Sequence, residues 1–178
     1  MTIENATVEQ LAKAIRNVPD FPQPGIQFKD ITPVLGDGRL FAGSIDLLTG
    51  HFQPGSVDAV VGIDARGFIF AAAVAYKLKC GFVPVRKKGK LPHQTYEQSY
   101  DLEYGSNTIA VHMDAVNPGS RVLLVDDLLA TGGTAGAAAN LLQRLGANIL
   151  EVTFLIELSF LKGREKLKGF PVRSLIVY

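Results

Sequence analysis

The stretch VLLVDDLLATGGT, residues 122–134, places reactive side chains between an apolar run and the start of a helix. Asp126 and Asp127 are adjacent carboxylates that repel one another, so a plain strand end has little reason to hold both. They become useful where they accept hydrogen bonds from ribose hydroxyls or lie near a bound cation. Ligands of open parallel sheets bind beyond the carboxyl ends of the strands, and we expect this pair to lie there.

The next residues, Ala130 to Thr134, could bind a single phosphate group. Gly132 and Gly133 allow backbone turns that are closed to other residues, which exposes N–H groups, and Thr131 and Thr134 add hydroxyl donors at the start of a helix. The spacing and lysine of a Walker A loop are absent, as is the G-x-G-x-x-G turn of dinucleotide-binding proteins. The alternative is structural: a glycine-rich helix entry behind an acidic cap.

Short apolar runs alternate with helical patterns along the chain, which is typical of βαβ units and a parallel sheet. The run at residues 122–125 does not alternate with polar residues, as expected of a central strand with helices on both faces. Pro84 makes another run weaker, because proline is normally confined to edge strands or bulges. The predicted strands are residues 59–63, 82–85, 122–125, 149–156 and 174–177.

Four segments have the spacing of helices. Val8, Leu11, Ala12 and Ile15 predict an amphipathic helix over residues 7–18, which Pro19 should end. Further helices are predicted over about residues 37–51, 67–78 and 134–145, with Gly146 as a left-handed cap.

Two segments are predicted to be loops. FPQPGIQF, residues 21–28, places two prolines and a glycine among apolar side chains, which favours an ordered loop. Residues 91–108 are polar, and loops of that length are usually lids or disordered. We expect one domain over residues 1–178, with an N-terminal helix and loop at about 1–35 and a flexible loop at about 91–108.

The composition argues against several classes of partner. The chain has 178 residues, 47% of them hydrophobic, which suits one good core. Its 18 basic and 17 acidic residues give a net charge of +1, so there is no global electrostatic case for nucleic acid or an anionic membrane. No apolar run approaches the roughly 20 residues of a membrane span, and no signal peptide is visible, so we expect a cytoplasmic protein. Cys80, the single cysteine, is expected to be a buried small hydrophobe.

Residues 122–134 closely resemble the motif with which type I phosphoribosyltransferases bind phosphoribosyl pyrophosphate (PRPP). Five further segments resemble the adenine-specific branch of that family, in the right order over nearly the full length: FPQPGIQFKDIT, GIDARGF, VPVRKKGKLP, YDLEYG and LKGREKL. The resemblance implies a Rossmann-like α/β fold, with a central parallel sheet flanked by helices, an N-terminal hood and a flexible lid loop. It also implies purine salvage: the phosphoribosyl group passes from PRPP to adenine, giving AMP and pyrophosphate, with inversion at ribose C1′ through an oxocarbenium-like transition state.

The resemblance assigns the two ends of PRPP to different segments. Asp126 and Asp127 are implied to hold the ribose 2′- and 3′-hydroxyls, and the 5′-phosphate is implied to bind Ala130, Thr131, Gly132, Gly133 and Thr134. The pyrophosphate is implied to bind at a strand end with unusual peptide geometry, together with a basic cluster: Asp64, Ala65, Arg66, Arg86, Lys87 and Lys90. Many relatives have serine where Ala65 stands. The alternatives are a solvated helix-start arginine and a solvated basic turn.

The hood is implied to cover the base, with Ile26 and Phe28 on its faces and nearby backbone groups at its edge. The predicted adenine-binding residues are Ile26, Gln27, Phe28, Lys29 and Leu128; Lys29 stands where arginine is often found. Glu103 and Tyr104 match lid residues that close over the site. The predicted catalytic residues are Glu103, as the acid–base group, with Asp127 and Arg66.

Mg²⁺ is implied to bind through PRPP, because the chain offers no metal-ligand cluster beyond the two aspartates. We expect a homodimer, since relatives use residues matching Arg86 and Lys90 in part across a dimer interface. Two alternatives remain open: a phosphoribosyltransferase for hypoxanthine, guanine or xanthine, and a PRPP-sensing regulator of transcription. The regulator needs a basic surface or a DNA-binding domain, and neither is visible in the sequence.

Overall fold

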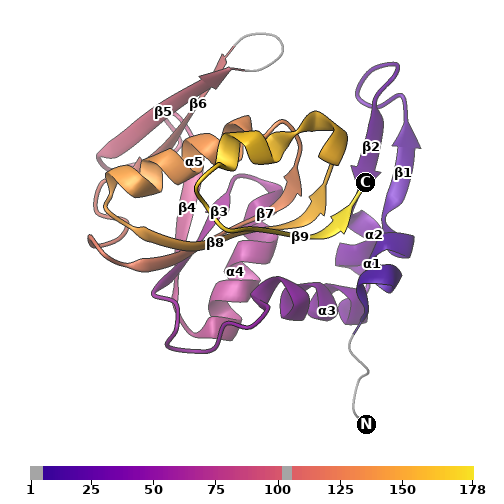
Figure 1. The fold of residues 1–178 in the computed structure, drawn as a ribbon, viewed down its shortest axis with the longest axis horizontal. Helices are drawn as coiled ribbons and strands as arrows, with labels where there is room; N and C mark the ends of the chain where they lie inside the picture. Colours follow the sequence, from indigo (N-terminus) through magenta and orange to yellow (C-terminus); the bar gives the residue numbers. More distant parts are fainter. Residues whose placement is uncertain (1–5, 102–105) are drawn as a thin grey trace. The chain divides into compact units, whose positions relative to one another are not determined.

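A seven-stranded sheet runs through the larger of the two units into which the chain divides, Met1–Leu47 and Leu48–Tyr178 (Figure 1). The structure is a computed structural model that describes residues 6–101 and 106–178. The sheet has the order β5-β6-β4-β3-β7-β8-β9, in which β4, β3, β7, β8 and β9 are parallel and β6 is antiparallel to both of its neighbours. The strands are β3 (Ala59–Ile63), β4 (Gly81–Lys87), β5 (Thr95–Asp101), β6 (Ser106–His112), β7 (Arg121–Leu129), β8 (Asn148–Glu157) and β9 (Val172–Val177).

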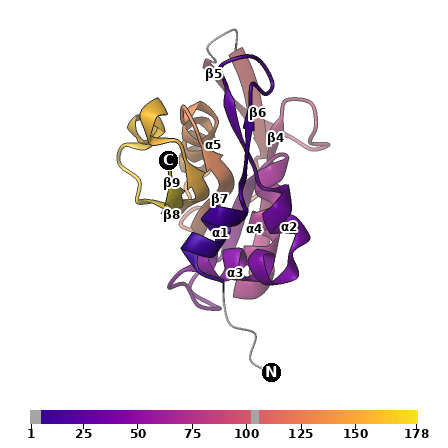
Figure 2. The same ribbon diagram turned by 90° about the vertical axis from the view of Figure 1, so that its right-hand side faces the viewer.

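Two helices cover opposite faces of this sheet, α4 (Arg66–Leu78) against β3 and β7, and α5 (Gly133–Arg144) against β5, β6 and β8 (Figure 2). All five residues of β3 are buried, and the apolar half of β7 is fully enclosed, as expected for strands covered on both sides. Gly146 has φ 77° after α5, so the predicted left-handed cap is confirmed. The predicted α/β class with a central parallel sheet is confirmed.

All five predicted strands are present, including the one that contains Pro84. Pro84 lies in an interior strand, opposite Gly62 of β3, yet β6 pairs with β4 only at Arg86 and Lys87. Pro84 lacks a backbone N–H, but no hydrogen bond to β6 is lost, because the described pairing between β4 and β6 does not reach Pro84. The β7 strand is longer than predicted and continues to Leu129, where it pairs with Glu157 of β8.

The smaller unit differs more from the prediction. Its first helix, α1 (Val8–Ala14), begins with a capping box between Thr7 and Gln10 but ends before the predicted position, because β1 (Arg16–Pro19) follows. β1 pairs with β2 (Gln27–Asp30), so the end of the predicted loop at 21–28 is a strand. α2 (Thr32–Gly36) was not predicted. α3 (Gly38–Thr49), which continues into the larger unit, confirms the predicted second helix, with Asp37 accepting backbone bonds at its start.

The polar segment predicted as one long loop is mostly a β-hairpin. β5 and β6 pair from Thr95 with His112 to Asp101 with Ser106. Residues 102–105 lie outside the described residues, so the predicted lid motion is not tested. Two 3₁₀ turns, η1 (Ser159–Leu161) and η2 (Gly163–Leu167), join β8 to β9. In the described part of the chain, every helix is too short or too polar to span a membrane.

Candidate active site

The two predicted carboxylates lie on β7, just beyond the point where pairing with β3 ends at Gly62 and Val125. Asp127 is 5% exposed, and its backbone N–H donates to Asp126 Oδ1 at 2.9 Å. A Cβ atom at Gly67 would overlap Asp126 Oδ1. Glycine at the second position of α4 therefore allows the helix to start directly beside the carboxylate.

Burial makes this pair electrostatically costly. Desolvation is the main cause that raises the pKa of Asp126 well above its usual range, and the neighbouring charge of Asp127 adds to it. Desolvation also raises the pKa of Asp127, while the charge of Arg66 opposes the shift. Arg66 Nε lies 2.9 Å from Asp127 Oδ2, yet this oxygen accepts no hydrogen bond within the described residues. Asp127 Oδ2 is therefore a buried acceptor with an ion-pair partner but no aligned hydrogen-bond donor among the described residues.

The loop after β7 has the geometry of an anion site. Gly132 adopts a left-handed conformation with φ 79° and ψ 0°, and α5 begins at the next residue without a side-chain cap. The first N–H groups of α5 therefore lack the usual capping oxygen, and a helix of 12 residues adds the positive end of its dipole.

These groups surround one cavity of about 360 Å³ at the carboxyl ends of β3 and β7. It brings together eleven of the predicted residues: Asp64, Ala65, Arg66, Asp126, Asp127, Leu128, Ala130, Thr131, Gly132, Gly133 and Thr134. Ile63, Leu129 and Ala135 also line it and were not predicted, because apolar residues next to the motifs carry no chemical signal.

The basic cluster adjoins this cavity through one ion pair. Arg86 Nε donates to Asp64 Oδ2 at 2.9 Å, and Arg86 Nη1 donates to the carbonyl of Lys90 at 3.0 Å. Lys87 and Lys90 are exposed and do not line the cavity. The peptide bond between Asp64 and Ala65 is cis, which agrees with the unusual geometry expected there.

The chain matches the family model described as "Phosphoribosyl transferase domain" over residues 36–169. It is 55% identical over 172 residues to the adenine phosphoribosyltransferase of Chloroflexus aurantiacus, an alignment that covers 97% of this chain and 99% of that protein. The crystal structure of adenine phosphoribosyltransferase from Thermoanaerobacter pseudethanolicus matches with a TM-score of 0.92 at 50% identity, covering 97% of this chain and 100% of that one.

The chain belongs to the adenine phosphoribosyltransferase family. A third relative is the Saccharomyces cerevisiae adenine phosphoribosyltransferase, with a TM-score of 0.89 and 43% identity over 94% of this chain and 97% of that one. That structure was solved in complex with D-2,5-dideoxy-2,5-imino-altritol 1,6-bisphosphate and adenine.

The predicted adenine-binding residues of this phosphoribosyltransferase, apart from Leu128, lie in the smaller unit. Gln27, Phe28 and Lys29 belong to β2, and Ile26, just before it, is 38% exposed. Phe28 packs edge-to-face on Phe21, with ring centroids 5.1 Å apart. Exposed apolar side chains on a short hairpin are suited to covering a flat base, but their placement against the cavity stays a prediction.

The predicted lid residues Glu103 and Tyr104 lie outside the described residues. Sequence reasoning also gave no role to two glycines, Gly67 and Gly163, that make close approaches around the cavity. Each belongs to a segment that resembles the phosphoribosyltransferase family. The sequence therefore marks both positions, but the close approach that requires glycine there is visible only in the structure.

For a metal, the described residues contain no group of three or more His, Cys, Asp or Glu side chains that could hold an ion. Asp126 and Asp127 offer hard carboxylate oxygens, which fit Mg²⁺ when substrate oxygens and water complete its shell.

Proposed function

We propose that this enzyme transfers the 5-phosphoribosyl group of PRPP to adenine, yielding AMP and pyrophosphate in purine salvage. The observation that carries the proposal is that one cavity is lined by a phosphate-type loop, by the half-buried Asp126 and buried Asp127 carboxylates, and by Arg66. A sugar with an anionic group at each end fits this lining, with one anion at the loop, the sugar hydroxyls at the carboxylates and the other anion at the arginine. The relatives named adenine phosphoribosyltransferase support adenine as the base.

The 5′-phosphate is assigned to the loop from Ala130 to Thr134, and the ribose 2′- and 3′-hydroxyls to Asp126 and Asp127. A hydroxyl that donates to Asp127 Oδ2 would supply the hydrogen bond that this buried oxygen lacks among the described residues. The pyrophosphate is assigned to Asp64, Ala65 and Arg66, with Arg86, Lys87 and Lys90 nearby. Arg86 is held at this end by its bond to Asp64.

The base is assigned to Ile26, Gln27, Phe28 and Lys29 of the hood, with Leu128 at the cavity. The yeast relative was solved with adenine, which supports a base site in this family. We further propose that the two units act together as one phosphoribosyltransferase domain over residues 1–178.

Chemically, the C1′–oxygen bond to pyrophosphate breaks and the bond from adenine N9 to C1′ forms with inversion, while N9 loses its proton. An oxocarbenium-like transition state needs no covalent nucleophile. Arg66 and the basic cluster would stabilise the charge that builds on pyrophosphate, and Glu103 would exchange the proton with the purine. Asp126 and Asp127 would hold the ribose in line for attack.

Mg²⁺ would enter with PRPP, bound by pyrophosphate and ribose oxygens, and would supply charge neutralisation of the leaving group. We also propose a cytoplasmic homodimer. Support for the dimer comes from α4, whose outward side chains Ile69 and Tyr76 are 40% and 87% exposed.

The decisive experiment supplies the protein with PRPP, Mg²⁺ and one purine at a time, and measures nucleotide and pyrophosphate formation. Adenine should be used far better than hypoxanthine or guanine, because a hood carbonyl that accepts from the 6-amino group would face another acceptor in 6-oxopurines. A site built on such a bond can discriminate by roughly 10⁴-fold. Comparable turnover of hypoxanthine would reject adenine specificity, and no turnover of any purine would reject the transferase assignment.

A further inference from the structure

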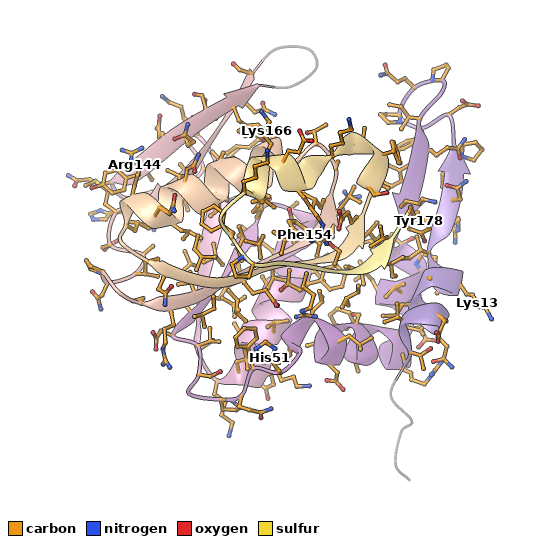
Figure 3. All side chains as sticks on the ribbon, viewed as in Figure 1. Lys13, His51, Arg144, Phe154, Lys166 and Tyr178 are labelled. Carbon is orange, nitrogen blue, oxygen red and sulfur yellow. The ribbon has the colours of Figure 1, made fainter. Side chains whose placement is uncertain are left out.

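The segment LKGREKL, residues 161–167, is part of the family resemblance but has no role in the assignments above. It follows β8 and forms the end of η1 and all of η2. Figure 3 shows Lys166 of η2 beside α5, and the close approach of Gly136 in α5 to the Lys166 carbonyl agrees with that view. The turn therefore lies against the helix that the phosphate loop opens.

The closest contacts between this turn and the phosphate loop are made by backbone atoms. A Cβ atom at Gly132 would overlap the Gly163 carbonyl oxygen, and one at Gly163 would overlap the Ala130 carbonyl oxygen. At Gly136, a Cβ would lie 3.0 Å from the Lys166 carbonyl oxygen. At these three positions glycine lets the two backbones approach closely, with the Leu129 side chain and Lys166 Cβ also among the nearest atoms, so the position of the turn directly limits the path of the loop.

One forked ion pair fixes the turn. Arg164 Nε donates to Glu157 Oε1 at 2.8 Å, and Nη2 donates to Glu157 Oε2, also at 2.8 Å. Arg164 Nη1 donates to the Val172 carbonyl at 3.1 Å, which ties the same side chain to β9. Glu157 is 5% exposed, and the hydrogen bonds from Arg164 lower the pKa of its carboxyl group, so the pair stays ionised at neutral pH.

We infer that Arg164 is a positioning residue for phosphate binding. Held by Glu157 at the end of β8, it presses the Gly163 backbone against Ala130 and Gly132 and so keeps the loop N–H groups aimed at the 5′-phosphate. Arg164 itself need not touch the ligand. This inference rests on the proposed assignment of the 5′-phosphate to that loop.

The test compares Arg164→Lys, which keeps the charge but loses the fork, with a matched control. Arg121→Lys removes a similar fork, in which Arg121 binds Asp58 through Nε at 3.1 Å and Nη2 at 2.7 Å, at the amino ends of β3 and β7. Calorimetric titration would give the dissociation constants of AMP and of adenosine, which lacks the phosphate. In Arg164→Lys we expect AMP to bind roughly tenfold more weakly, which corresponds to a loss of about 1.4 kcal/mol of binding free energy. The dissociation constant of adenosine should not change.

The ratio of AMP to adenosine affinity separates positioning from general stability, because a merely structural loss would weaken both ligands. An unchanged ratio in Arg164→Lys, or an equal fall in Arg121→Lys, would overturn the inference. Glu157→Gln, which keeps the side-chain shape, provides the same comparison if Arg164→Lys fails to fold. Failure of the proposed function is distinguishable, since the unaltered enzyme would then not bind AMP at all.

Discussion

At the scale of single residues, the two aspartates of β7 are placed to bind a ligand, and their burial lowers the stability of the unliganded protein at neutral pH. Both have pKa values raised above the ordinary 3.8, chiefly by desolvation. A raised carboxyl pKa means that the native state binds more protons than the unfolded chain. Stability from these groups is therefore present below the ordinary value and is lost as pH rises through the folded pKa values.

Asp127→Asn should accordingly separate function from stability. Because hydrogen bonds to a charged group contribute about 1.5–3 kcal/mol, kcat/KM for PRPP should fall by about 10–100-fold. The melting temperature without ligand should equal or exceed that of the unaltered protein, and by more at about pH 8 than at about pH 4. Thermal scans at both pH values and steady-state kinetics would check this. A lower melting temperature with unchanged turnover would instead give Asp127 a structural role.

Glu103 provides a second prediction at this scale. A carboxyl group enclosed by a lid can exchange protons with the purine, so Glu103→Gln should lower kcat by roughly 10²–10⁴-fold while PRPP binding stays near that of the unaltered enzyme. Single-turnover kinetics would make chemistry the measured step. Glu97→Gln is the control, because Glu97 belongs to the same polar stretch of sequence, lies on β5 and pairs with Lys88 at 2.7 Å. Unaltered single-turnover rates in Glu103→Gln would end the proposal.

At the scale of elements, glycine at position 132 has two possible causes: its left-handed backbone conformation and the close approach of the Gly163 backbone. Comparison with a second glycine that shares only the first cause separates them. Gly132 has φ 79° and faces the Gly163 backbone, whereas Gly119 has φ 82° and no atom near its missing Cβ. Both substitutions to alanine strain the backbone by roughly 1 kcal/mol or more. We expect Gly132→Ala also to weaken AMP binding at least roughly tenfold, with Gly119→Ala unaffected. Equal AMP affinity in the two variants, measured by titration, would contradict a role for the close approach.

The elements that sequence predicted well are those that the core dictates. Residues 59–63 and 122–125 are wholly apolar, as strands buried on both faces usually are. The first run was predicted with both bounds of β3 correct, and the second lies within β7 but covers only part of it. β1, β2, β5 and β6 were missed, because Pro19, Pro22 and Gly25 obscure the first hairpin and polar residues such as Glu97, Gln98 and Ser99 dominate the second. Their pairing comes from partner strands, which a local pattern does not contain.

The candidate site likewise has a part that the sequence predicts and a part that it does not. Asp126 to Thr134 could be predicted because one continuous segment carries the carboxylates and the loop, and the cavity brings Asp64, Ala65 and Arg66 to it as expected. The Arg164–Glu157 pair could not be predicted, since nothing in either residue's neighbours specifies that the two side chains meet. Glu157 ends β8 and Arg164 lies on η2, so their contact depends on how the connection between β8 and β9 folds back.

For the whole molecule, helix α4 is apolar on both sides, which a helix of an isolated protein rarely is. One side, with Phe70, Val74 and Leu78, is buried. The other side carries Ile69, Ala72, Ala73 and Tyr76 at the spacing of one helical stripe, and Ile69 and Tyr76 are exposed. On β4 next to it, Phe82 packs against Phe68 with centroids 5.3 Å apart. A second copy of the chain is the occupant that we expect on this face.

The dimer is tested by placing charge on that stripe. A double variant, Ile69→Glu with Tyr76→Glu, should be monomeric in sedimentation velocity at concentrations where the unaltered protein is a dimer, because burying two carboxylates from each of two identical faces costs several kcal/mol. Phe160→Glu is the control, since Phe160 is 69% exposed but lies on η1 rather than on α4. Should Arg86 act across the interface, the monomer would also lose turnover while keeping its melting temperature. A double variant that stays dimeric, or an unaltered protein that is monomeric throughout, would place the apolar stripe outside any dimer interface.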